Sequence, residues 1–188
     1  MIKQTRLLFL SAGHSNTPGR DQGAPGIRES EGIITTRIRN KVVTRLRSLG
    51  YTVYRDIDNS VTSQTVAYVR SLFLPKSALV ADIHCNSVVN REVSRTEVVI
   101  PDTHTKFEML AATRLLDAMS RATGIRKGSV LLESQTYRKK LLWMSIDAEN
   151  VLLELGFISN PSDYNKIINN EEALVIALCN ELEYLITN

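Results

Sequence analysis

Residues 79–87 read LVADIHCNS, an apolar run that ends in a histidine followed by small polar residues. Two further runs have the same form: LLFLSAGH at residues 7–14, and VLLELGF at residues 151–157, where a glutamate interrupts the apolar sequence. Burial of an unpartnered polar group is costly, on the order of 2–7 kcal/mol even for a neutral one. We therefore expect these runs to bring His14, His84 and Glu154 into one site, where a bound cation is the simplest partner.

The length and composition fit one soluble globular domain, residues 1–188. The chain has 188 residues, of which 43% are hydrophobic and 23% charged, as in ordinary soluble domains. Its formal charge of +3 is only mildly basic, and no basic stripe interleaved with aromatic residues suggests a nucleic-acid partner. No run approaches the roughly 20 apolar residues of a membrane span. We expect neither nucleic acid nor a membrane as a partner.

The two cysteines and the chain start exclude further classes. Cys85 and Cys179 lie far apart without any CxxC motif, which argues against a cysteine-rich zinc module and a disulfide scaffold and favours free buried thiols. The start MIKQTRLLFLSAGH has an apolar core of about four residues, against the 7–15 of a signal peptide. We expect no signal peptide in this chain.

Strand and helix patterns alternate along the chain. The continuous apolar run at residues 6–12 is typical of a strand in a parallel sheet that is covered on both faces. Residues 31–49 place apolar side chains at helical spacing, and Gly50 stands where a C-terminal cap belongs. We further expect strands at 51–55, 78–84, 96–100 and 151–155, and helices from residue 59 or 60 to about 73, at 106–123, and from about 170.

This alternation predicts an α/β fold: a single domain with a twisted, mostly parallel β-sheet and helices on both faces. In such sheets, ligand sites form at the carboxyl ends of the strands, where His14 and His84 fall. The loop at residues 13–28 is sixteen residues long, and loops of that length in compact domains are usually functional or disordered.

A catalytic zinc ion commonly takes two histidines and a carboxylate and leaves one position for water. His14 and His84 supply two such ligands, and the loop leads to Glu29 and Glu31 at the head of a helix, whose dipole favours an ionised carboxylate. Glu154 is suited to take a proton from water as a general base. Each residue also has a simpler interpretation. His14 can be a polar loop residue, His84 a strand-end histidine bonded to the backbone, and Glu154 a glutamate that faces water.

Four motifs in combination resemble one enzyme family. They are GHSNTPGRDQGAPG at 13–26, ESEG at 29–32, DIHCNS at 82–87 and LLELGFISNPSDY at 152–164. Together they resemble the zinc-dependent N-acetylmuramoyl-L-alanine amidases of the type 3 family, which cleave peptidoglycan. The resemblance extends from Leu7 to Leu185.

The resemblance implies that His14, Glu31 and His84 bind zinc and that Glu154 is the general base. Glu31 is preferred because the family's ligand opens its helix about nineteen residues before the glycine that ends it, and Gly50 minus 19 is 31. Glu29 stays the alternative ligand.

Three more residues are candidates for supporting roles. Asp82 stands where the family tends to have a small hydroxyl residue; because residues two apart on a strand share a face, it is expected to steady His84 from the second shell. By the same alternation Cys85 points away from the metal. Asn86 is expected to bond substrate or to stabilise its loop. Glu97 occupies a position where the family often has a glutamate, and either orients substrate or water or is a surface strand charge.

The implied activity is hydrolysis of the amide between the lactyl group of N-acetylmuramic acid and L-alanine of the stem peptide. Two alternatives remain at this point: a zinc peptidase or carboxypeptidase acting on stem peptides, and a wall-binding domain without turnover. We expect peptidoglycan as the partner and a monomer, although no feature fixes the oligomeric state. A wall hydrolase without a signal peptide resembles a phage endolysin, made in the cytoplasm and acting at the wall after release, and equally a trimmed domain of an exported enzyme.

Overall fold

A six-stranded sheet in the order β2-β1-β3-β6-β4-β5 forms the centre of the computed structural model, which describes residues 4–188. Residues 1–3, where the chain start considered above begins, lie outside the described part. Strands β1, β2, β3 and β6 are mutually parallel, β4 runs antiparallel to β6, and β5 is parallel to β4. The predicted mostly parallel sheet is confirmed. The strands are β1 Leu8–Ala12, β2 Val53–Arg55, β3 Leu79–Asn86, β4 Thr96–Ile100, β5 Lys127–Leu132 and β6 Glu149–Phe157.

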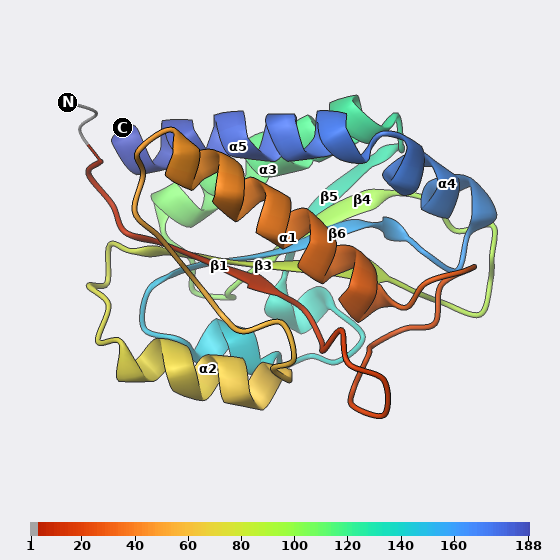
Figure 1. Cartoon of the computed structure of the whole chain (residues 1–188), viewed down its shortest axis with the longest axis horizontal. Coiled ribbons are helices and arrows are strands. Elements are labelled where there is room, and N and C mark those ends of the chain that lie inside the picture. Colours follow the sequence, from red (N-terminus) through yellow and green to blue (C-terminus); the bar gives the residue numbers. More distant parts are fainter. Residues whose placement is uncertain (1–3) are drawn as a thin grey trace.

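Helices cover both faces of this sheet, as the alternation predicted (Figure 1). Helices α1 (Glu31–Ser48), α3 (Lys106–Thr123) and α5 (Glu171–Thr187) pack on one face, with α5 against both α1 and α3. Helix α2 (Thr62–Ser71) and the short 3-10 helix η2 (Leu142–Ser145) cover the other face. Helix α4 (Pro161–Asn169) joins β6 to α5, and η1 (Glu133–Gln135) follows β5. Among residues 4–188, every helix is too short or too polar to span a lipid bilayer.

The alternation of side chains along each strand divides the core into two clusters. Leu79, Ala81 and Ile83 of β3 pack into the larger cluster, beneath α1, α3 and α5. Val80 of β3 and Leu152 of β6 belong to the smaller cluster, with residues of α2 and η2. Because side chains two apart on a strand share a face, the polar residues that follow Val80 and Leu152 in steps of two lie on the α2 face.

Helix α3 begins and ends where the sequence predicted. The Thr105 hydroxyl accepts the Glu108 N–H at its start, and Gly124 at its end has a left-handed backbone with φ of 70°, which a glycine adopts without steric cost. The expected start of α2 at residue 59 or 60 was wrong: the helix begins at Thr62, and its N-cap is Val61, whose N–H donates to the Gln64 side chain. Ser60 instead lies in a turn, in which its N–H donates to the Ile57 carbonyl.

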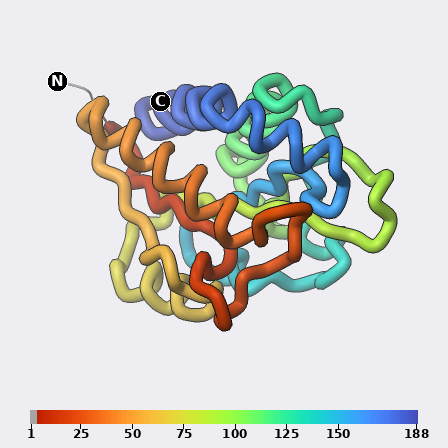
Figure 2. The backbone as a smooth tube through the Cα atoms, turned by 45° about the vertical axis from the view of Figure 1, so that its right-hand side comes forward, coloured from red at the N-terminus to blue at the C-terminus, as the bar shows by residue number. Residues whose placement is uncertain are grey.

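Two elements were not predicted. Strand β5 and helix α4 both fall in stretches without an assignment from the sequence. The tube trace in Figure 2 shows how the chain after β6 turns through α4 before α5 runs back across the molecule.

Candidate active site

The carboxyl ends of β1, β3 and β6 meet at one edge of the sheet, because these three strands are parallel. His14 follows the end of β1, and His84 and Glu154 lie near the ends of β3 and β6. His84 and Glu154 stand directly opposite each other in the register of the two strands. His84 and Glu154 are therefore neighbours on the α2 face, and the His14 ring lies 5.3 Å from that of His84, measured between centroids.

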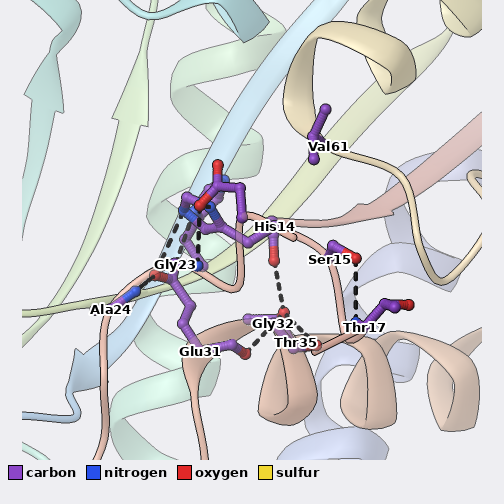
Figure 3. A network of polar contacts seen from close by, with 12 residues as sticks. His14, Ser15, Thr17, Gly23, Ala24, Glu31, Gly32, Thr35 and Val61 are labelled. Atoms are coloured by element: carbon purple, nitrogen blue, oxygen red, sulfur yellow. Dashed lines mark hydrogen bonds and ion pairs between the residues drawn. The ribbon is translucent and has the colours of Figure 1, made fainter. Parts of the chain in front are cut away.

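Glu31, the first residue of α1, contacts both histidines, and Figure 3 shows its side chain beside His14. Its Oε1 lies 2.9 Å from His84 Nδ1, and its Oε2 lies 3.5 Å from His14 Nε2. The same oxygens accept the backbone N–H groups of Cys85 at 3.1 Å and Ala24 at 3.0 Å. One ligand atom from each of His14, Glu31 and His84 lies within 4.8 Å of the others. These residues form what we call the His-Glu-His cluster.

Each imidazole of this cluster has a second carboxylate at its other nitrogen. His84 Nε2 lies 2.9 Å from Asp82 Oδ2, and His14 Nδ1 lies 3.0 Å from Asp21 Oδ1. Carboxylates in such places fix the tautomer and ring orientation of metal-binding histidines. The structure thus places Asp82 where the sequence suggested it. Asp21 was missed, and its position as an acid inside the long loop after His14 was the only available signal.

Two glycines let the backbone come close to the cluster. A Cβ on Gly13 would lie 2.2 Å from Cε1 of His84, and a Cβ on Gly23 would lie 2.5 Å from Oε2 of Glu31. The Thr35 hydroxyl of α1 also donates to the Gly13 carbonyl at 2.9 Å, an interaction visible in Figure 3. The long loop is therefore folded tightly around the site and is not a loose connection.

Opposite charges in the cluster support each other. Burial by itself raises the pKa of the Glu31 carboxyl, but the hydrogen bond to His84 and the charges of both histidines hold that pKa below its ordinary value. Burial lowers the pKa of His84, yet the neighbouring Asp82 and Glu31 carboxylates outweigh it and raise the pKa well above 6.5. A proton and a metal ion therefore compete for this imidazole.

The donor set of the cluster fits a divalent metal ion. Two imidazoles and one carboxylate are a donor set of catalytic zinc sites, and Glu31 is 3% exposed, so that its charge is kept from water. Glu154 gives a second indication that the site holds a ligand, because its Oε2 is buried and has no hydrogen-bond partner among residues 4–188. That orphaned oxygen lies on the strand position next to His84.

The environment of Glu154 disfavours its charged form. Burial raises its pKa to about 8; the nearby Glu31, Glu97 and Asp82 carboxylates act in the same direction, and His84 acts against them. Glu154 is half-buried and its Oε2 is shielded from solvent, so it is not a freely solvated surface glutamate.

Glu97 and Asn86 lie next to Glu154. Glu97 stands directly opposite Glu154 in the antiparallel register of β4 and β6. Its Oε2 accepts the Asn86 amide at 3.1 Å, and its Oε1 accepts Nε of Arg95 at 2.6 Å. Because Glu97 is only 4% exposed, the surface-charge interpretation does not hold. Glu29, the alternative ligand, lies outside the cluster and pairs with Arg37 at 2.8 Å.

The sequence and the fold were compared with those of known proteins. The sequence model of one family, described as N-acetylmuramoyl-L-alanine amidase, matches residues 8–183. A comparison with curated proteins gives no match.

Several solved structures have the same fold. The catalytic domain of CwlV, an N-acetylmuramoyl-L-alanine amidase from Bacillus (Paenibacillus) polymyxa var. colistinus, superposes with a TM-score of 0.77 at 19% identity, covering 97% of this chain and 99% of that one. An N-acetylmuramoyl-L-alanine amidase from Clostridium difficile 630 gives 0.79 at 17% identity, covering 97% and 98%. The catalytic domain of an endolysin targeting Clostridia difficile gives 0.73 at 19% identity, covering 94% and 96%.

Proposed function

Because the chain belongs to the N-acetylmuramoyl-L-alanine amidase family, we propose that it is a zinc-dependent hydrolase that cleaves the amide between the lactyl group of N-acetylmuramic acid and L-alanine of the peptidoglycan stem peptide. One observation carries this proposal beyond the family match. A buried carboxylate joins two imidazoles from neighbouring strand ends, with the unpartnered carboxyl of Glu154 beside them.

In this proposal the His-Glu-His cluster holds the zinc ion. The atoms that face the common space are His14 Nε2, His84 Nδ1 and the two oxygens of Glu31. Zinc bound there supplies a Lewis acid, which polarises a carbonyl and lowers the pKa of water. Asp21 and Asp82 keep the two imidazoles oriented from behind.

Glu154 is the general base. Its pKa of about 8 in the protein alone falls when a divalent cation is bound beside it, since the cation favours the carboxylate. Glu154 then takes one proton from the attacking water as the new carbon–oxygen bond forms. It returns that proton to the nitrogen of L-alanine as the carbon–nitrogen bond breaks, so the products are a carboxylic acid and an amine.

Asn86 and Glu97 position the substrate next to this base. Their hydrogen bond joins Asn86 of β3 to Glu97 of β4, the residue that stands opposite Glu154. Because neither contacts the His-Glu-His cluster in the described hydrogen bonds, we assign them to substrate and not to the metal.

A soluble substrate, N-acetylmuramic acid linked to a stem peptide, tests this assignment. We expect Glu154→Gln to lower kcat by about 10²–10⁴, the usual contribution of a general base, while the zinc content stays at that of the wild type. Glu92→Gln, a change at an exposed glutamate of the β3–β4 loop, is the matched control and should leave both unchanged. A Glu154→Gln variant with normal kcat would remove Glu154 from the mechanism.

A further inference from the structure

A line of side chains leads away from the His-Glu-His cluster across the sheet. His84, Glu154 and Glu97 stand opposite one another on β3, β6 and β4. Neighbouring strands are about 4.8 Å apart, so Glu97 lies about 10 Å across the sheet from His84. The guanidinium of Arg95 continues this line through its bond to Glu97. The proposed hydrolysis uses Glu154 and the cluster but leaves Arg95 without a role.

Arg95 is held in place on three sides. Its Nε donates to Glu97 Oε1 at 2.6 Å, and its guanidinium carbon lies 4.9 Å from the ring centroid of Phe157. A Cβ on Gly128 of β5 would lie 3.2 Å from Cδ of Arg95 and 3.1 Å from Cγ of Glu97. The absence of a side chain at Gly128 thus makes room for the aliphatic parts of the Arg95 and Glu97 side chains.

An irregularity in β6 brings Phe157 beneath Arg95. His84 pairs with Glu154 but Asn86 pairs with Phe157, so β6 has one residue more than β3 over this step. Such a bulge re-aims the side chain that follows it. Asp163 links Phe157 to the residue before Arg95. Its Oδ2 accepts the Phe157 N–H at 3.1 Å, and its Oδ1 accepts the hydroxyl of Ser94 at 2.6 Å.

The far end of the guanidinium remains available. The Arg95 side chain is 34% exposed, whereas that of Glu97 is 6% exposed. In the hydrogen bonds described for residues 4–188, only Nε of Arg95 has a protein acceptor. Its two Nη groups can therefore form the paired hydrogen bonds by which arginine binds a carboxylate.

From this geometry, and resting on the proposed function, we infer that Arg95 binds a free carboxylate of the stem peptide on the side of the leaving amine. In an extended peptide two residues span about 7 Å. A peptide whose first nitrogen lies at Glu154 can thus bring the α-carboxylate of its second residue, D-glutamate linked through its side chain, to Arg95. Amidation of that carboxylate removes the ligand. Arg95 therefore makes the protein selective for walls in which the second stem residue is not amidated.

Two substrates that differ only in this group test the inference: N-acetylmuramoyl-L-alanyl-D-glutamate and its D-isoglutamine counterpart, each with the γ-carboxyl of the second residue blocked as a methylamide. We expect the zinc-loaded wild type to prefer the carboxylate form, with kcat/KM about tenfold higher, mainly through KM. Arg95→Met should remove this preference by lowering kcat/KM for the carboxylate form alone. Arg95→Lys should keep part of it, and Arg91→Met, a change of an exposed arginine in the same loop, should keep all of it.

Two outcomes would contradict a carboxylate subsite at Arg95. Equal losses on both substrates in Arg95→Met would mean that Arg95 acts only by holding Glu97, and the subsite would be refuted. NMR titration with the free dipeptides L-alanyl-D-glutamate and L-alanyl-D-isoglutamine, each with its γ-carboxyl blocked as a methylamide, measures the same preference without turnover. A carboxylate preference lost in Arg95→Met supports the subsite, and equal binding contradicts it. Failure of the wild type to cleave either substrate would instead contradict the proposed function.

Discussion

Glu154 is a carboxyl group placed where its charge is unfavourable. It lies among the Glu31, Glu97 and Asp82 carboxylates, its Oε2 has no partner in the described part of the chain, and its pKa is raised to about 8. Residues with strongly shifted pKa values cluster at functional sites. The cost of this placement should be measurable as a dependence of stability on pH.

The sign of that dependence follows from the two pKa values. Between the ordinary value of 4.5 and the folded value of about 8, the folded protein holds the Glu154 proton more tightly than the unfolded chain does. The stabilisation is complete below pH 4.5 and is lost as the pH rises through 8. In protein stripped of metal by chelation, we expect Glu154→Gln, which cannot ionise, to exceed the wild type in stability by a few kcal/mol near pH 9.

Urea unfolding of both proteins as a function of pH measures this difference. The two free energies of unfolding should converge as the pH falls below 4.5, because Glu154 is then protonated in both states. A difference that stays constant across the whole range would contradict the buried, unpartnered state of Glu154.

Glu29 and Glu31 are two residues apart but have different partners. Glu31 contacts both histidines, while Glu29 pairs with Arg37. We expect Glu31→Gln to weaken zinc binding by more than the roughly 10–100-fold that loss of an outer-sphere partner costs. Glu29→Gln should leave zinc affinity intact and cost at most about 1 kcal/mol of stability, as for other partly exposed ion pairs. Chelator competition measures both affinities, and the reverse ranking would return Glu29 to the ligand set.

The backbone just after β1 packs directly against the imidazole of His84 and limits the space for that ring. Because a Cβ on Gly13 would lie 2.2 Å from the His84 ring, Gly13→Ala forces the imidazole to move. We expect zinc affinity to fall by at least about tenfold, and stability by about 1–3 kcal/mol as in other overpacked sites.

Gly19 of the same loop provides the matched control. A Cβ there meets nothing within 4 Å, although its φ of 81° makes Gly19→Ala strained. We expect this variant to lose about 1 kcal/mol of stability but to retain zinc affinity. Equal zinc affinities for Gly13→Ala and wild type, by the same competition assay, would show that His84 does not need the space beside Gly13.

The direction of β4 decides which of its residues reaches the site. Since β4 runs antiparallel to β6, its first residues lie beside the carboxyl end of β6, and Glu97 comes to face Glu154. The connection at residues 87–95 has only nine residues and no helix, too few for the crossover that a parallel strand needs. The length of this connection therefore indicates an antiparallel β4 from the sequence alone.

At the scale of the whole molecule, local patterns predicted most of the fold. Helix α3 has a closing glycine at residue 124, and the buried strands have continuous apolar runs. Strand β5, Lys127–Leu132, lies at the sheet edge with glycine and serine among its residues and is partly exposed, so it has little hydrophobic pattern. Helix α4 has only nine residues, too short for a clear helical repeat.

The candidate site was partly predictable for the same reason. His14, His84 and Glu154 interrupt or end apolar runs, so the sequence alone singles them out. Asp21 and Arg95 lie in loops, and their contacts depend on how those loops fold back onto the strands. No local pattern encodes such contacts, and they follow only from the assembled structure.

Mass spectrometry of purified peptidoglycan digested by the zinc-loaded protein, with Glu154→Ala run in parallel, tests the proposed amidase activity directly. We predict that the wild type alone releases free stem peptides that begin with L-alanine. Shortened peptides that remain attached to muramic acid would identify a peptidase. No release by the zinc-loaded wild type from several wall chemistries would contradict an amidase and favour a wall-binding domain.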